Sequence, residues 1–128
     1  MAPGRTGSEP GIAIKRVYLP PDDGDGHRVL VDRLWPRGLA RSAAHLDDWL
    51  KAVAPSPDLR KWFNHDPAHW QEFQQLYRGE LRDNPAVETL LEQAAKGKVT
   101  LLYAAHDETR NHALVLLDYL LDRKKAQK

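Results

Sequence analysis

The sequence predicts an α/β fold: a small, mostly parallel or mixed sheet of about three to four strands, flanked by helices, in a single domain. Three observations lead to this prediction. Residues 98–105 (KVTLLYAA) form a short, almost continuous apolar run, which is typical of a strand covered on both faces. Two earlier segments also have strand character, and several helical segments separate them from residues 98–105. The order strand, strand, several helices, strand, helix favours a buried sheet with helices around it.

The first half of this sheet comes from two segments joined by a loop. Residues 12–19 alternate in polarity and are rich in β-branched side chains, and residues 27–35 form the second expected strand. The acidic loop 20–26 between them resembles a calcium loop only superficially. A calcium loop that starts at Asp23 would need glycine where Arg28 stands and glutamate where Leu34 stands. We therefore expect a solvated turn.

Helices are expected next, and most of them have clear start signals. The expected helical segments are 45–53, 56–63, 66–81, 84–96 and 106–121. Side chains of the type that caps a helix precede several of these segments, and proline often follows at the first helical position. The expected caps are Ser56, Asp66, Asn84 and Asp107, and Gly97 suits a helix end. The apolar faces expected for the first three helices are Leu46, Trp49, Leu50, Val53; Leu59, Trp62, Phe63; and Trp70, Phe73, Leu76, Tyr77, Leu81. Those expected for the last two are Val87, Leu90, Leu91, Ala94; and Ala113, Leu117, Leu120, Leu121.

The domain boundaries follow from composition. Residues 1–11 are rich in glycine and proline and are expected to be a disordered tail, whereas 12–122 form the single α/β domain. Residues 123–128 are expected to be a basic C-terminal tail. A chain of 128 residues is long enough to bury a substantial core.

Composition excludes several classes of function. The net charge of +1 gives no global attraction to nucleic acid or to anionic membranes. The absence of cysteine excludes disulfides, thiolate nucleophiles and cysteine metal sites. The sequence contains no apolar run of membrane-spanning length, no signal peptide, no glycine-rich phosphate loop and no nucleophile-elbow serine. We expect a cytoplasmic location, no cofactor, no metal and no membrane partner, and the sequence does not predict an oligomeric state.

The first candidate site is the stretch 31–38 (VDRLWPRG), at the carboxyl end of the second expected strand. Ligands of open α/β sheets bind beyond such strand ends. Asp32 is expected to be partly buried and therefore to need a partner, which Arg33 or Arg37 could supply as an ion pair. Arginine side chains also hold phosphate or carboxylate with two parallel hydrogen bonds. A ligand clamp and a purely structural turn are both compatible with this pattern, and Trp35 could be buried or form a pocket wall.

The second candidate site lies at the end of the 98–105 strand, where the last helix begins. A helix N-terminus there could attract an anion, although Asp107 could simply cap the helix. His112 is expected one turn inside this helix, beside Asn111. The spacing of His106, Asp107 and His112 matches no known metal site, so no metal is predicted.

The third candidate site is the stretch 65–69 (HDPAH). His65 and His69 are four residues apart, but Pro67 belongs at the first helical position, which leaves His65 outside the helix. The two histidines would therefore not share a helix face. A His–Asp pair in a capping turn, with a functional role for His65, is the hypothesis that remains.

Three blocks of the chain together resemble a known family. The blocks VDRLWPRG, APSPDLRKWFNHDPAHWQEFQQLYRGEL and VTLLYAAHDETRNHALVLLDYL occur in this order within residues 12–122. They resemble the YeaO-like branch of the uncharacterised bacterial family catalogued as domain of unknown function 488. The resemblance implies a small α/β domain with no established activity. Other branches of that family carry a Cys-His-Arg run where this chain has Asn111, His112 and Ala113, so only the histidine is shared.

The leading functional hypothesis is a protein that binds, and could act enzymatically on, a small anionic ligand bearing phosphate or carboxylate, at the carboxyl edge of the sheet. The candidate catalytic residues are Asp32, His112 and His65. The candidate ligand-binding residues are Arg33, Arg37, Trp35, Asp107 and Asn111. The first alternative is a structural or protein-interaction domain without catalysis. A second, less favoured alternative is a nucleic-acid-associated module that uses Arg33, Arg37 and Arg41 with exposed tryptophans.

Overall fold

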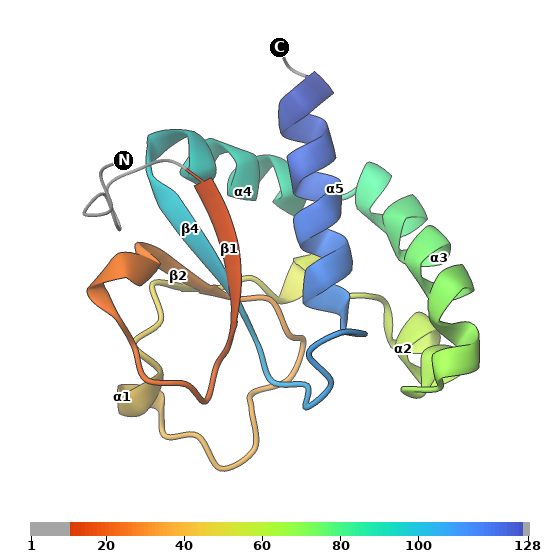
Figure 1. The fold of residues 1–128 in the computed structure, drawn as a ribbon, viewed down its shortest axis with the longest axis horizontal. Coiled ribbons are helices and arrows are strands. Elements are labelled where there is room, and N and C mark those ends of the chain that lie inside the picture. The colour runs from red at the N-terminus through yellow and green to blue at the C-terminus, as the bar shows by residue number, and fades with distance from the viewer. Residues whose placement is uncertain (1–10, 127–128) are drawn as a thin grey trace.

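A four-stranded parallel sheet organises the computed structural model, which describes residues 11–126 (Figure 1). The strands are β1 (Gly11–Arg16), β2 (His27–Leu30), β3 (Asp48–Trp49) and β4 (Lys98–Tyr103). Their order across the sheet is β1-β4-β2-β3, and every neighbouring pair is parallel. The predicted α/β class is therefore confirmed, with a sheet that is wholly parallel.

Strand β4 occupies the centre of the sheet, between β1 and β2. Its residues from Val99 to Tyr103 are all buried, as the apolar run in the sequence predicted. The register pairs Val29 with Leu101 and Leu30 with Leu102. Because β2 and β4 are adjacent and parallel, the segments that follow them emerge at the same edge of the sheet.

Within residues 11–126, five helices flank the sheet: α1 (Arg41–Ala44), α2 (Pro57–Phe63), α3 (Trp70–Arg82), α4 (Pro85–Lys96) and α5 (His112–Ala126). Short 3₁₀ segments cover Asp23–Asp25, Lys51–Val53 and Pro67–His69. Three of the predicted caps are confirmed, those before α2, before the 3₁₀ segment Pro67–His69 and before α4. Ser56 accepts a hydrogen bond from the Leu59 N–H, and Asp66 and Asn84 cap their own segments in the same way.

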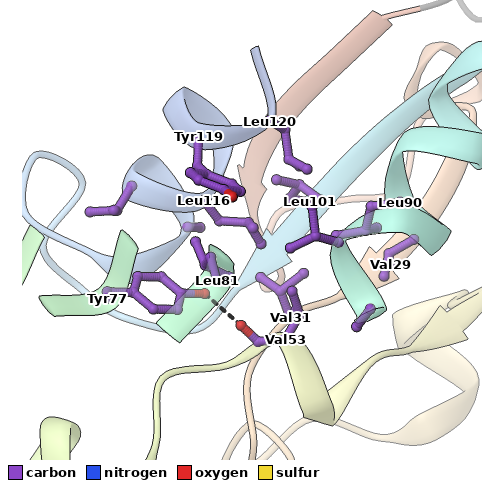
Figure 2. Packing of buried hydrophobic residues seen from close by; sticks show 14 of the residues in the cluster. Val29, Val31, Val53, Tyr77, Leu81, Leu90, Leu101, Leu116, Tyr119 and Leu120 are labelled. Atoms are coloured by element: carbon purple, nitrogen blue, oxygen red, sulfur yellow. Dashed lines mark hydrogen bonds between the residues drawn. The ribbon is translucent and has the colours of Figure 1, made fainter. Parts of the chain in front are cut away.

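The two faces of the sheet are covered differently. Helices α3, α4 and α5 gather on one side, while α1 and its flanking loops lie on the other (Figure 1). The larger core cluster contains Val29, Val31 and Leu101 together with side chains of α2–α5. Figure 2 shows this cluster, in which the Tyr77 hydroxyl donates to the Val53 carbonyl over 2.6 Å. On the other face Leu30 and Leu102 pack against a smaller set that includes Trp35 and Trp49.

The predicted helix over 45–53 is wrong. The Asp47 and Leu50 N–H groups donate to the carbonyls of Arg28 and Leu30, so this segment continues the sheet as β3. Trp49 joins the smaller core cluster instead of forming a helical stripe. Sheet pairing and burial override the apolar spacing, which had matched a helix.

The expected strand over 27–35 also ends early, at Leu30. The Val31 N–H still donates to the Leu102 carbonyl, and the chain then turns away from the sheet. The Trp49 indole donates to the Asp32 carbonyl over 2.7 Å and holds this turn in place.

The boundaries of the last helix differ from the prediction at both ends. Helix α5 begins at His112 rather than near Asp107, and Asn111 accepts from the Leu114 N–H in the manner of an N-cap. At its other end α5 continues past residue 122 to Ala126, into the expected basic tail. Of the expected N-terminal tail, Gly11 belongs to β1, and residues 1–10 lie outside the described part of the chain.

Three side chains assigned to apolar faces are exposed instead. Trp62, Leu76 and Leu121 lie on the surface, while their neighbours Phe63, Tyr77 and Leu120 are buried. Over residues 11–126, no helix has the length and apolar character that crossing a membrane requires.

Candidate functional site

The carboxyl edge of the sheet carries a pocket of about 560 Å³. Its walls come from the segments that follow β2 and β4, from α2 and the turn after it, and from the start of α5. A crevice beyond the carboxyl ends of parallel strands is where open α/β sheets bind ligands. Because β2 and β4 are parallel neighbours, the segments that follow them both reach this pocket.

Asp32 and His112 meet in this pocket. The His112 Nε2 atom lies 3.1 Å from Asp32 Oδ1, and both side chains are 16% exposed. The same Nε2 lies 3.1 Å from the Val31 carbonyl, with hydrogen-bond geometry. Because a carbonyl oxygen only accepts, Nε2 carries a proton and donates it to Val31, which leaves Asp32 Oδ1 without a hydrogen-bond partner in residues 11–126. The Ala104 N–H donates to Asp32 Oδ2 over 3.1 Å, so the carboxylate connects the ends of β2 and β4 with the start of α5.

This arrangement corrects two expectations. Within residues 11–126 Asp32 has no arginine partner, because His112 and the Ala104 N–H take that place. His112 is also not one turn inside α5 but its first residue. That position brings the imidazole back over the end of β2.

Arg33 lines the pocket through a side chain that is tied to the backbone. Its Nη2 donates to the carbonyls of Ala54 and Pro55, over 3.4 and 3.2 Å. Its buried Nε has no hydrogen-bond partner in the part of the chain that the structure describes. The guanidinium is thus held in one place by neutral oxygens, and its positive charge is not neutralised by a carboxylate there.

Three further cations line the pocket: Arg37, Arg60 and Lys61. None of the three forms an ion pair with a carboxylate among residues 11–126, whereas Arg28 pairs with Asp25 there. The sequence did not predict Arg60 and Lys61 as site residues, because nothing in the pattern of α2 distinguishes them from charged side chains on the solvent-exposed face of a helix. Only the packing of α2 beside the sheet edge reveals them.

His65 lines the same pocket from the turn after α2. Asn64 and His65 both have positive φ values, 46° and 53°. Consecutive left-handed residues other than glycine are uncommon, and such strain is concentrated at functional sites. The His–Asp pair in this capping turn involves His69, whose Nε2 lies 3.9 Å from Asp66 Oδ2, while Asp66 Oδ1 accepts from the Ala68 N–H.

Asp107 and Asn111 have local roles. Asp107 is outside the pocket lining, and it accepts from the N–H groups of Thr109 and Arg110 in the turn before α5. The hydrogen bonds from the Thr109 N–H and hydroxyl lower the pKa of Asp107. Asn111 does line the pocket, but it is 2% exposed and caps α5. A capped helix start has fewer free N–H groups to offer an anion.

Trp35 forms part of the pocket wall and belongs to the smaller core cluster. Its indole N–H donates to the Leu39 carbonyl over 2.7 Å, and its ring meets Trp49 edge to face. The Arg41 guanidinium lies 4.3 Å from the centre of the Trp35 ring. This aromatic ring is therefore fixed by its own neighbours.

No set of three or more His, Asp or Glu side chains in the described ranges is grouped so as to hold a metal ion. In the pocket, Asp32 supplies the only carboxylate, and cationic donors outnumber it.

Fold and site together define a small α/β domain whose parallel sheet carries a cationic pocket at its carboxyl edge. The family model described as the inactive DUF488-N3 subclade matches residues 11–128. The uncharacterized protein YeaO of Escherichia coli K12 is 44% identical over 110 residues, which are 85% of this chain and 96% of that protein. The uncharacterized protein Rv3073c of Mycobacterium tuberculosis H37Rv is 39% identical over 115 residues, which are 90% of this chain and 98% of that protein. The chain therefore belongs to the DUF488 family, within its YeaO-like branch. No solved structure matches it.

Proposed function

We propose that this protein binds a small anionic ligand, bearing phosphate or carboxylate, in the pocket at the carboxyl edge of the sheet. The observation that supports this most strongly is the charge of the pocket lining. Arg33, Arg37, Arg60 and Lys61 face it without carboxylate partners in residues 11–126, and its single carboxylate, Asp32, already contacts His112. Cations gathered around a concave site attract anions, and arginine binds them with directional hydrogen bonds.

Binding without turnover is the form of this proposal that we favour. The description of the matching family model includes the word inactive, which agrees with a site that recognises a ligand without transforming it. Asp32 and His112 then position the pocket wall. His65 remains a candidate contact to the ligand, since it lies in the lining on a strained turn.

The structural alternative has support at one residue. Arg33 holds the carbonyls of Ala54 and Pro55, as a clamp that only stabilises the fold would do. Arg37 differs, because its side chain is exposed and only its backbone carbonyl is used, as the acceptor for the Tyr18 hydroxyl. Arg37→Ala therefore separates ligand binding from stability.

The contacts of the tryptophans disfavour nucleic-acid binding. Stacking of bases would need accessible aromatic faces. Arg41 covers Trp35, and the Lys51 ammonium lies 4.2 Å from the centre of the Trp49 ring. Trp35 and Trp49 thus already have cationic partners, and the His69 ring stacks on the exposed Trp62 with the ring centres 4.3 Å apart.

The test is a thermal-shift screen of the full chain against inorganic phosphate, phosphorylated metabolites and carboxylates at constant ionic strength. A ligand at a hundred times its Kd stabilises the folded state by about 2.7 kcal/mol, which raises Tm by several degrees. We expect Arg37→Ala to abolish this shift while its own Tm stays near that of the wild type. The matched control is Arg82→Ala, at an exposed arginine outside the pocket, and it should keep the shift. The proposal fails if no anion shifts Tm, or if both variants respond equally.

A further inference from the structure

The size of the pocket bears on what its ligand is. A pocket of about 560 Å³ lies within the range of roughly 300–1,000 Å³ that is typical of sites for organic molecules. An inorganic anion would occupy only a small part of it. The remaining walls must therefore suit the rest of the ligand.

Much of the remaining wall is apolar. Phe63 and Phe73 stack on each other with their ring centres 4.3 Å apart, and both contribute to the lining. Pro55 and Pro57 add rigid apolar surface beside them. Leu34 lies in the lining with 64% of its surface exposed, the largest exposed fraction among the exposed large apolar side chains of residues 11–126. An apolar side chain left in water at a pocket wall favours an apolar group on the ligand.

Acidic hydrogen-bond acceptors are scarce in the same walls. Among the lining residues that the structure describes, Asp32 is the only acidic one; its Oδ2 accepts from the Ala104 N–H, and its Oδ1 has no hydrogen-bond partner in residues 11–126. A sugar would place its hydroxyl groups against the apolar side chains of Phe63, Pro55 and Leu34, and polar groups held against apolar surface cost binding free energy. A polyhydroxyl body is therefore disfavoured relative to an apolar one.

The charge of the lining selects among anions. Four cations stand against one carboxylate, and that carboxylate already contacts His112. A phosphate monoester carries about −1.5 to −2 charges at pH 7, more than the single charge of a carboxylate. It also offers three oxygens to donors that come from separate elements, Arg33 and Arg37 after β2 and Arg60 and Lys61 on α2.

We propose that the ligand of this pocket is a phosphate monoester of a flat apolar group, with the phosphate held by the cations and the apolar group packed against the Phe63 and Leu34 side of the wall. This inference rests on the proposed function and narrows it. Phosphorylated sugars, simple carboxylates and inorganic phosphate are then weaker ligands than an aryl phosphate.

The experiment is isothermal titration calorimetry of the full chain at constant ionic strength with four probes: phenyl phosphate, inorganic phosphate, glucose 6-phosphate and benzoate. We expect phenyl phosphate to bind about tenfold more tightly than each of the other three, because only its ring gains from leaving water. Leu34→Ala should weaken phenyl phosphate several-fold and leave inorganic phosphate unchanged. The matched control Leu76→Ala, at an exposed leucine outside the pocket, should change neither.

The outcomes separate this inference from the proposed function. Equal affinity for the three phosphates, or tighter binding of benzoate, would overturn the inference and leave an anion site in place. Equal effects of Leu34→Ala on phenyl phosphate and on inorganic phosphate would also overturn it. If none of the four probes binds while other anions shift Tm through Arg37, the inference alone fails. If no anion shifts Tm, the proposed function fails with it.

Discussion

The carboxylate of Asp32 connects three elements at the carboxyl edge of the sheet, and its replacement by asparagine is the most informative single change for stability. Oδ2 accepts from the Ala104 N–H at 3.1 Å. Oδ1 lies 3.1 Å from His112 Nε2, but the Nε2 N–H donates to the Val31 carbonyl, so Oδ1 has no hydrogen-bond partner in the described residues. An asparagine side chain has one oxygen and one NH₂ group. Whichever way it is turned, its NH₂ faces one of these two donors. Asp32→Asn therefore either loses the hydrogen bond from the Ala104 N–H or places its NH₂ group against the donor Nε2 of His112, where both native side chains are 16% exposed.

We expect Asp32→Asn to lower the free energy of unfolding by about 1–3 kcal/mol, the usual cost of leaving a buried polar group unsatisfied. For a chain of this size each 1 kcal/mol corresponds to a fall in Tm of roughly 3–6 °C. Urea unfolding measures this free energy directly. If its dependence on urea concentration is unchanged, the variant exposes the same surface area on unfolding as the wild type. Asp118→Asn, at an exposed carboxylate of α5, is the matched control and should stay within about 0.5 kcal/mol of the wild type. If Asp32→Asn were as stable as this control, the role given to Asp32 would be refuted.

Three further predictions concern the core and the opposite edge of the sheet. Tyr77→Phe removes the buried hydroxyl that donates to the Val53 carbonyl, and it should cost about 1–3 kcal/mol of unfolding free energy in urea. Burial raises the pKa of Asp25, but hydrogen bonds, chiefly from Lys15, outweigh it and lower the pKa below its ordinary value of 3.8. The pKa of Asp25 is lower in the folded state than in the unfolded state, so the ionised carboxylate stabilises the fold. This stabilisation is complete above about pH 4 and is lost as the pH falls through the folded-state pKa. In Asp25→Asn, the free energy of unfolding should therefore fall less steeply as the pH is lowered in the acid range. Gly26→Ala should cost about 1–3 kcal/mol, measured by the same urea titration, since φ is +66° and a Cβ would overlap a backbone carbonyl of β4; a neutral effect would contradict that geometry.

The sequence was sufficient to predict β1, β2, β4 and the helices α2–α5, because their signals are local. The apolar run of β4 and the caps at Ser56, Asp66 and Asn84 each determine an element through its own residues. The segment 45–53 failed because its apolar spacing suits a helix while its backbone pairs with β2. That pairing depends on residues far away in the chain, so no local pattern reports it.

The candidate site was predictable in position but not in its contacts. Strand ends identified Asp32, Arg33 and Arg37, and parallel pairing of β2 with β4 brings them into one pocket with His112. The partner of Asp32 was not predictable, because an arginine nearby in sequence competes with a histidine 80 residues further along the chain. Arg60 and Lys61 were missed for a related reason, since their role depends on where α2 packs.

The central claim, an anion site at the carboxyl edge of the sheet, is tested most directly by mapping the binding of inorganic phosphate with ¹H–¹⁵N NMR spectra at constant ionic strength. Binding in the pocket should give saturable shifts of the backbone amides of the non-proline residues in 32–37, of 60–65, and of Ala104, Ala105, Asn111 and His112, while the amides of α4 stay unchanged. The same titration of Arg37→Ala should show no saturation in the millimolar range in which the wild type saturates. Shifts that do not saturate, or that spread over α4 and the basic end of α5, would contradict it.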